Sequence, residues 1–350
     1  MSRSLIRRSL ATASAAVTAL VLVACSEPSE GGDTDAETTA ASGDEQTTIT
    51  VYTSEPEEKV DEINAAFMEA HPDISVEVYR AGTGDLNARI ESEKASGGIE
   101  ADVLWAADSP TFEGYAADGD LAELQDVDTE GLMEEVVDEE GYYVGTRIIP
   151  TVIAYNTDVI SEDDAPQSWQ DLTDPEYMDQ LVMPDPAVSG AAAFNASVWL
   201  ESEELGEEWL SALAENQPMI AQSNGPTSQE IASGSRPVGV VVDYLVRDLA
   251  DAGSPIATAY PEEGAPYITE PAGAFEASEN KEAAETYINF LLSEEAQNLA
   301  VEQAYLPVRE GIDTPEDTPA LEDINLLNPD LEAVTENQDD AVSTFQELMS

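Results

Sequence analysis

The sequence predicts an α/β protein of two domains, each built on a doubly wound sheet. Its 350 residues are about the length of two domains. Strand and helix patterns alternate from residue 48 onward with short connections, which is the order of a mostly parallel sheet covered on both faces. Hydrophobic residues make up 42% of the chain, enough to fill a sizeable core.

The chain begins with a segment typical of export. Residues 1–24 place three arginines before a small, apolar run that is too short for a membrane span of about 20 apolar residues. The run ends Leu22-Val23-Ala24-Cys25, which resembles a bacterial lipobox. The resemblance implies cleavage before Cys25, diacylation of its sulfur and a lipid tether to the membrane. An ordinary secretory signal with an incidental cysteine is the alternative.

A polar segment separates this signal from the first strand. Residues 25–46 are rich in Ser, Gly, Thr and acids and show no apolar periodicity. Such a composition cannot bury enough apolar surface to fold. We therefore expect a disordered acidic tether.

The first domain is predicted from a β-α-β-α-β order. Residues 48–52 alternate as a strand, and Val60, Ile63 and Phe67 mark the apolar face of a helix. A second strand covers 74–78. Gly82-Thr83-Gly84-Asp85 then opens a helix, and the apolar run 101–107 predicts a buried third strand.

A second α/β unit and a helical tail follow. Residues 142–155 form one long extended segment interrupted by Pro150, and the tail from 313 is rich in proline and acids. The other expected strands are 180–184, 237–242 and 256–260, and the expected helices are 191–200, 206–215, 283–292, 295–303 and a terminal helix through 331–348.

The charge balance excludes several classes of function. The chain has 74 Asp and Glu against 12 Lys and Arg, a formal charge of −62. That excludes nucleic-acid binding through phosphate neutralisation and adsorption to anionic lipid through a basic patch. The acids are spread over the whole chain, and their repulsion is screened at about 1 M salt, where the Debye length is roughly 3 Å. The composition is typical of adaptation to high salt.

Cysteine and histidine are too scarce for several kinds of site. A single cysteine excludes a disulfide framework within the chain and a Cys-rich metal site. A single histidine argues against a His-based zinc site and against Ser-His-Asp catalysis. No motif for a nucleophile elbow, a zinc protease, a P-loop or dinucleotide binding is present. The sequence therefore predicts a protein that is not an enzyme and needs no cofactor. Hydrolysis by a pair of carboxyl groups is the enzyme alternative, because counting residues does not exclude it in so acidic a chain.

Eight short segments resemble, in order, the extracellular solute-binding proteins of ABC importers, in the group that binds ferric iron, organophosphates or phosphonates. The segments cover about residues 48–312 and are VYTS from 51, GTGDLNARI from 82, ADVLWAADS from 101, IIPTVIAYNTDVI from 148, APQSWQDLTDP from 165, DPAVSGAAA from 185, PVGVVVDY from 237 and AYPEEGAPYITEPAGAF from 259.

The resemblance implies a periplasmic-binding-protein-like fold of two lobes, each a doubly wound mixed sheet, with ligand between them and a hinge of crossing strands. Lobe 1 would comprise 47–147 and 270–312, and lobe 2 would comprise 148–269. The acidic segment 313–350 would follow. The implied partners are a small solute, an ABC permease and its ATPase, at the outer face of the cytoplasmic membrane.

Small polar residues at strand ends are the candidate ligand contacts. In open α/β sheets, ligands bind outside the carboxyl ends of the strands, where helix N-termini offer free N–H groups. Thr83-Gly84 and Ser189-Gly190 open helices after strands, and Ser54 and Ser109 add hydroxyl groups. This pattern favours a small oxyanion such as an organic phosphate or phosphonate. The alternative for each residue is plain helix capping.

Three further residues are candidates around this oxyanion. Arg147, near the predicted crossing, would grip a phosphate bidentately or form an interlobe ion pair. Asp243 would hold an amine of the ligand or cap the next helix. Tyr244 follows it at the end of the same predicted strand.

Ferric iron is the alternative ligand. The iron-binding relatives carry two adjacent tyrosines where this chain has Asp243-Tyr244, and many carry a histidine in the first loop, where this chain has residues 53–56. The anionic ligands that Fe(III) needs are not assembled by the sequence, so no metal site is predicted. A sensor subunit that presents ligand to a receptor is the alternative of another class. A neighbouring permease gene would favour import, and a neighbouring histidine kinase gene would favour sensing.

Overall fold

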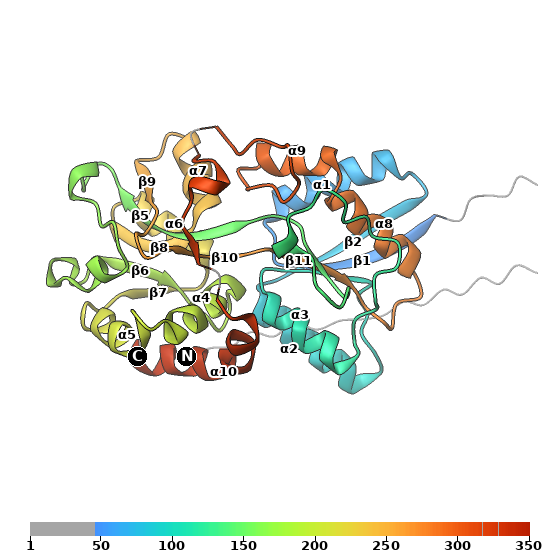
Figure 1. Ribbon diagram of the computed structural model, residues 1–350, viewed down its shortest axis with the longest axis horizontal. Coiled ribbons are helices and arrows are strands. Elements are labelled where there is room, and N and C mark those ends of the chain that lie inside the picture. Colours follow the sequence, from blue (N-terminus) through green and yellow to red (C-terminus); the bar gives the residue numbers. More distant parts are fainter. Residues whose placement is uncertain (1–45, 317, 328) are drawn as a thin grey trace, which may run out of the picture. The chain divides into compact units, whose positions relative to one another are not determined.

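The computed structural model describes residues 46–316, 318–327 and 329–350 (Figure 1). The predicted signal, Cys25 and all but the last residue of the predicted tether lie outside these residues. Two mixed sheets form the framework, which confirms the predicted α/β class. None of the helices in the described residues is long and apolar enough to cross a membrane.

The first sheet has the strand order β2-β1-β3-β11-β4. Its first three strands are parallel, and β11 runs antiparallel to both of its neighbours. The strands are β1 (Thr47–Thr53), β2 (Ile74–Arg80), β3 (Val103–Trp105), β4 (Val144–Gly145) and β11 (Pro271–Ala274). The accompanying helices are α1 (Glu57–Ala70), α2 (Thr83–Ser96), α3 (Ser109–Asp118), α8 (Lys281–Leu291) and α9 (Glu294–Glu302), with a 3-10 turn at Glu134–Val136.

Helices cover both faces of this sheet, and the side chains of β1 point alternately toward one face and the other. Ile49 and Val51 are fully buried with α1 and α8, whereas Tyr52 packs with Leu86 and Ile90 of α2 on the opposite face. Figure 1 shows α1 and α8 on one side of the sheet and α2 and α3 on the other. Because successive strand side chains point to opposite faces, apolar residues at consecutive positions are what a doubly covered sheet requires.

The second sheet has the order β12-β10-β5-β8-β6-β7, with β9 pairing the other part of β5. Its strands are β5 (Ile149–Asn156), β6 (Leu181–Pro184), β7 (Met219–Ala221), β8 (Val238–Val242), β9 (Ile256–Ala259), β10 (Ala265–Ile268) and β12 (Leu326–Leu327). Its helices are α4 (Gly190–Glu201), α5 (Gly206–Glu215), α6 (Asn224–Ala232), α7 (Asp243–Asp251) and α10 (Leu331–Leu348), with 3-10 turns at Glu162–Asp164, Gln170–Thr173, Pro175–Tyr177 and Leu321–Asp323.

We call the part of the chain around each sheet a lobe. The chain passes from the first lobe to the second between β4 and β5 and returns between β10 and β11. At this point the two passages touch, because the amides of Thr146 and Arg147 both donate to the carbonyl of Thr269, at 2.9 and 3.2 Å. The next residue, Glu270, has φ of 44°, which is uncommon for a side chain other than glycine and marks a constrained crossing.

Two expectations about chain organisation need adjustment. The extended segment expected over 142–155 is divided into two strands, β4 and β5, which belong to different sheets, and the chain changes lobe between them. The C-terminal segment joins the second lobe, since β12 pairs with β10 and α10 packs on α4. α10 also reaches the first lobe, where Gln338 donates to the Asp108 carboxylate at 3.0 Å.

Candidate ligand-binding site

A pocket of about 360 Å³ lies where residues of both lobes meet. Most of its lining residues lie at or just after the carboxyl ends of β1, β2, β3, β6, β7 and β8, the edge at which open α/β sheets bind ligands. This volume is in the usual range for small-molecule sites. The lining residues are Ser54, Glu55, Pro56, Arg80, Gly82, Thr83, Ala107, Ile149, Val188, Ser189, Gly190, Ala191, Ser223, Asn224, Gly225, Pro226, Val242, Tyr244, Leu245, Ile268 and Glu270.

Five helices begin at this pocket. The lining includes the residues at or next to the N-termini of α1 and α2 from the first lobe and of α4, α6 and α7 from the second. The first turn of each helix has amide groups without an intrahelical acceptor, and the aligned peptide dipoles give this end a positive potential. The pocket is therefore suited to a negatively charged group.

Hydroxyl groups at the pocket are left free to contact a ligand. Thr83 is 3% exposed, and its Oγ1 has no hydrogen-bond partner in the described part of the chain. Ser189 Oγ accepts hydrogen bonds from the Ala192 amide and from Asn224 Nδ2, at 3.3 and 2.9 Å. Those bonds leave the Ser189 hydroxyl proton available. The Ser54 hydroxyl proton is available in the same way, because Ser54 Oγ accepts a hydrogen bond from the Ala107 amide at 3.2 Å.

Asn224 holds three of the helix N-termini together. Its amide group donates to Ser189 at the start of α4, and its Oδ1 accepts from the Val242 amide, just before α7, at 3.2 Å. Asn224 itself is the first residue of α6. This side chain therefore fixes the spacing of the donor groups that the second lobe presents to the pocket.

The lobes touch at the rim of the pocket through glycine. The Gly84 amide lies 3.4 Å from the Val188 carbonyl. A Cβ on Gly84 would stand 2.2 Å from the Ala187 carbonyl oxygen, and one on Gly190 would stand 2.7 Å from Thr83 Oγ1 and 2.8 Å from the Ala107 carbonyl oxygen. Glycine at these positions allows the backbones of the two lobes to approach this closely.

Arg80 is the cation among the lining residues. It is the last residue of β2, and it is exposed. Its Nε donates to the Glu55 carbonyl at 2.9 Å, which places the guanidinium beside the start of α1. Its Nη2 donates to the Ser54 carbonyl at 3.4 Å. The N–H groups that these two bonds do not use can bind an anion.

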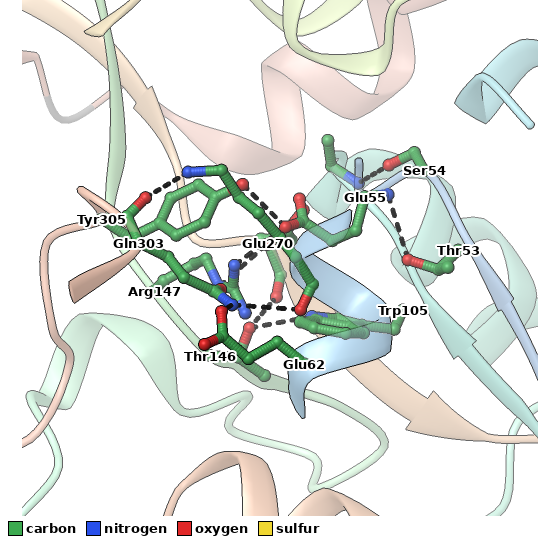
Figure 2. Close-up of polar contacts among 12 residues, drawn as sticks. Thr53, Ser54, Glu55, Glu62, Trp105, Thr146, Arg147, Glu270, Gln303 and Tyr305 are labelled. Carbon is green, nitrogen blue, oxygen red and sulfur yellow. Dashed lines mark hydrogen bonds and ion pairs between the residues drawn. The ribbon is translucent and has the colours of Figure 1, made fainter. Parts of the chain in front are cut away.

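Two buried carboxyl groups also line the pocket. Glu55 and Glu270 are 3% and 1% exposed. Figure 2 shows both near Arg147, whose Nη1 lies 2.8 Å from Glu55 Oε2 and whose Nε lies 3.1 Å from Glu270 Oε2. Tyr305 donates to Glu55 Oε2 at 2.7 Å. One buried arginine is thus shared by two glutamates.

The pKa values of these two acids are shifted in opposite directions. Burial alone would raise the pKa of Glu55, but the Arg147 charge and hydrogen bonds with Glu270 and Tyr305 hold that pKa below its usual value. Burial, followed by the nearby Glu55 carboxylate, raises the pKa of Glu270 well above its usual value. Glu270 is therefore the acid of the pair that holds a proton more readily, and Glu55 is the carboxylate that Arg147 and Tyr305 bind.

Aromatic rings enclose this charge network. Tyr244 lines the pocket and packs against Tyr305 with the rings tilted by 43° and their centroids 4.3 Å apart. The Lys59 ammonium lies 4.9 and 4.7 Å from these two ring centroids and pairs with Asp248 at 2.8 Å. Burial raises the pKa of Tyr244 well above its usual value, so its phenol is protonated at neutral pH.

The structure brings together five of the nine residues that the sequence proposed as ligand contacts. Ser54, Thr83, Ser189, Gly190 and Tyr244 all line the pocket. The remaining four are not among the lining residues, and each has another role. Gly84 makes the interlobe contact described above, and Arg147 lies beneath the pocket between Glu55 and Glu270.

The other two proposed contacts are occupied by protein partners. Ser109 begins α3, and its hydroxyl lies 3.4 Å from that of Thr269. Asp243 is fully buried and pairs with Arg247, one turn along α7, at 2.7 Å. Tyr260 lies 3.3 Å from the same carboxylate oxygen. Both contacts of Asp243 are made by Oδ2, and its Oδ1 has no hydrogen-bond partner in the described part of the chain. Asp243 is not among the residues that line the pocket.

Several lining residues were not proposed from the sequence. Asn224 was detectable, because Ser223-Asn224 followed by Pro226 is a typical helix start. Glu55 and Arg80 follow or end strands, but charged residues at strand ends are common in so acidic a chain. Glu270 had no local signal, since it reaches the pocket only through the return of the chain between the lobes.

Comparison with known proteins identifies the family to which this chain belongs. A family model described as bacterial extracellular solute-binding protein matches residues 100–337, more than half of the chain. The chain belongs to this family. It is therefore the substrate-binding protein of an ABC transporter, with a periplasmic or extracellular location, as the resemblance in the sequence implied.

Individual members differ in what they bind. Iron uptake protein A1 of Synechocystis is 24% identical over 283 residues, covering 77% of this chain and 78% of that protein. The structure of iron-bound HitA from Pseudomonas aeruginosa has a TM-score of 0.77 and 24% identity, covering 86% of this chain and 99% of that one. AfuA from Actinobacillus pleuropneumoniae, solved with fructose-6-phosphate, has a TM-score of 0.78 and 19% identity, covering 87% and 99%. These likenesses show the shared two-lobed fold.

Proposed function

We propose that this substrate-binding protein captures a small organic phosphate or phosphonate between its lobes and delivers it to a membrane permease. The observation that carries the proposal is the convergence of five helix N-termini on one pocket. Free hydroxyls of Thr83, Ser189 and Ser54 and the guanidinium of Arg80 supply further donors. A phosphate-type group has three oxygens that accept such hydrogen bonds.

The acidic composition does not oppose anion binding at this place. Exposed acids act through solvent and are screened in concentrated salt, whereas amide and hydroxyl donors act at contact distance. Closure of the lobes would remove water from the group and strengthen those contacts. The lobes would close because the ligand binds the closed state better than the open one.

Ferric iron is the second candidate, because two of the similar proteins carry iron in their names or titles. Tyr244 lines the pocket together with Glu55 and Glu270. However, Arg147 already pairs with both acids, and no group of three or more His, Cys, Asp or Glu in the described residues could hold a metal ion. Fe(III) prefers several anionic oxygen ligands in one place, which this arrangement does not supply.

A panel of ligands tests the choice between these candidates. Melting temperature is measured in molar salt with aminoethylphosphonate, glycerol phosphate, hexose phosphates, inorganic phosphate and ferric citrate. We expect an increase with at least one organic phosphate or phosphonate and none with ferric citrate. An increase with ferric citrate alone, with a visible phenolate band, would replace the proposal with iron.

A melting temperature higher in low salt than in molar salt would contradict adaptation to high salt.

The membrane anchor remains a separate proposal from the sequence. We infer that Cys25 becomes the lipidated N-terminus of the mature protein, which would hold the protein near its permease. Mass spectrometry of the N-terminal peptide from the membrane fraction is expected to show a diacylated Cys25. An unmodified cysteine, or a cleavage site elsewhere, would contradict the anchor and leave the binding function untouched.

A further inference from the structure

The pocket has an acidic end that an anion alone does not explain. Glu55, at the start of α1, and Glu270, between β10 and β11, come from the two passages of chain beside Arg147. Both line the same pocket as Thr83 and Ser189. An oxyanion site built only to bind negative charge gains nothing from two buried carboxyl groups in its wall.

The hydrogen bonds leave one acceptor at this end without a donor. Glu55 Oε2 accepts from Arg147 at 2.8 Å and from Tyr305 at 2.7 Å. Glu270 Oε2 lies 3.1 Å from Arg147 Nε without hydrogen-bond geometry, and no N–H group in the described part of the chain donates to it. Its contact with the Glu55 carboxyl group depends on a proton that the two acids share. A buried acceptor without an N–H donor is costly, and a ligand N–H group would satisfy it.

We propose that the ligand is a zwitterion, and that its ammonium group binds at the carboxyl groups of Glu55 and Glu270 while its phosphate or phosphonate binds at the helix N-termini. This inference rests on the proposed function, which it narrows from organic phosphates in general to those that carry an amine. Glu270 is the main contact, because Glu55 is already bound by Arg147 and Tyr305.

The charges around Glu270 make this binding a proton-linked event. The pKa of Glu270 is affected by Glu55 and Lys59 at the start of α1 and by Arg147 at the crossing. The Glu270 charge in turn raises the pKa of three phenols, those of Tyr244 in α7, Tyr287 in α8 and Tyr305. Lys59 is offset by Asp248, and the three phenols are held neutral by burial. Arg147 therefore balances one carboxylate, and the second carboxyl group keeps its proton.

An incoming ammonium supplies the missing positive charge. It favours the ionised form of Glu270, whose carboxyl group then releases its proton to solvent. The balance is one Glu270 carboxyl group and one ligand ammonium giving one carboxylate–ammonium pair and one free proton. A ligand with a hydroxyl group in place of the ammonium brings no charge and releases no proton from Glu270.

Calorimetry on a matched pair of ligands tests this inference. 2-Aminoethylphosphonate and 2-hydroxyethylphosphonate are titrated into the protein at pH 7, each in several buffers that differ in ionisation heat. We expect the amino compound to bind at least about 10-fold more tightly, which corresponds to about 1.4 kcal/mol. We also expect it to release more protons than the hydroxyl compound, whose own phosphonate titration serves as the reference.

A variant separates the role of Glu270 from a general effect of charge. Glu270→Gln is expected to reduce both the preference for the amino compound and the extra proton release. Glu279→Gln, an exposed glutamate in the same lobe outside the pocket, should retain both. Melting temperatures of both variants show whether they are folded. If Glu270→Gln does not fold, the comparison of the two phosphonates on the wild-type protein still tests the ammonium site.

The outcomes distinguish this inference from the proposal beneath it. Equal affinity and equal proton release for the two phosphonates would overturn the ammonium site and leave the oxyanion pocket standing. Binding of neither compound, together with binding of ferric citrate, would overturn the proposed function itself. A preference for the amino compound that Glu270→Gln leaves unchanged would also overturn the assignment.

Discussion

Gly84→Ala is expected to lower ligand affinity about 100-fold without unfolding the protein. The added Cβ would stand 2.2 Å from the Ala187 carbonyl oxygen of the other lobe, a separation that real Cβ atoms do not show. Both atoms are held by backbone, so the contact is relieved only if the lobes separate. If the closed state is reduced to about 1% of its original population, the apparent Kd rises about 100-fold, or about 2.7 kcal/mol.

The effect of this substitution on folding should be small. Gly84 lies in the first turn of α2 and has no positive φ, so alanine fits the backbone and is the better helix former. Gly114→Ala in α3 is a matched control, because a Cβ there has no neighbour within 4 Å. Titration calorimetry and melting temperature measure both variants. Unchanged affinity in Gly84→Ala would show that binding does not need this approach of the lobes.

Arg147→Met is expected to destabilise the protein by about 3–5 kcal/mol at pH 7. Arg147 is 2% exposed and is the cation that pairs with both Glu55 and Glu270. Methionine keeps part of the side-chain volume but leaves the buried carboxyl groups uncompensated, and a buried charge without its partner is strongly destabilising. Chemical denaturation measures the loss. Arg236→Met, which removes a partly exposed arginine 3.9 Å from Asp179, should cost less than about 1 kcal/mol.

The pH dependence of Arg147→Met has a definite sign. In the wild-type protein the lowered pKa of Glu55 contributes stability at neutral pH, and this contribution is lost as the pH falls through that pKa. In the variant, both carboxyl groups are buried without a cation, so their pKa values in the folded state exceed those in the unfolded state. The loss of unfolding free energy in the variant, relative to the wild-type protein, should therefore be largest at neutral pH and become smaller as the pH falls. A deficit that widens in acid would contradict this account of Arg147.

The sequence predicted the fold class because its signals were local. The alternating residues of β1 and the apolar run of β3 predict buried strands without knowledge of their neighbours, and the helix pattern beginning at Thr83 predicts α2. The segment through β4 and β5 was predicted as extended, but local signals do not divide it into two strands, because extended backbone looks the same whether or not it changes sheets. What separates the two strands is their pairing with β11 and β8, which are distant in the sequence.

The candidate site was predictable in part for the same reason. Thr83 and Ser189 were detectable because they open helices directly after strands, and both line the pocket. The acidic end was not, because Glu55 and Glu270 are two of 74 acidic residues, and only the return of the chain between lobes brings them together. Arg147 was noticed for its charge, but its position between two acids is a tertiary feature.

A crystal structure of the protein with 2-aminoethylphosphonate tests the central claim most directly. The account predicts the phosphonate oxygens within hydrogen-bond distance of the Thr83 and Ser189 hydroxyls and of amides at the starts of α4 and α6, with the lobes in contact at Gly84. It predicts the ligand nitrogen beside Glu270. A ligand bound outside this pocket, or a metal ion held by Tyr244 in its place, would contradict it.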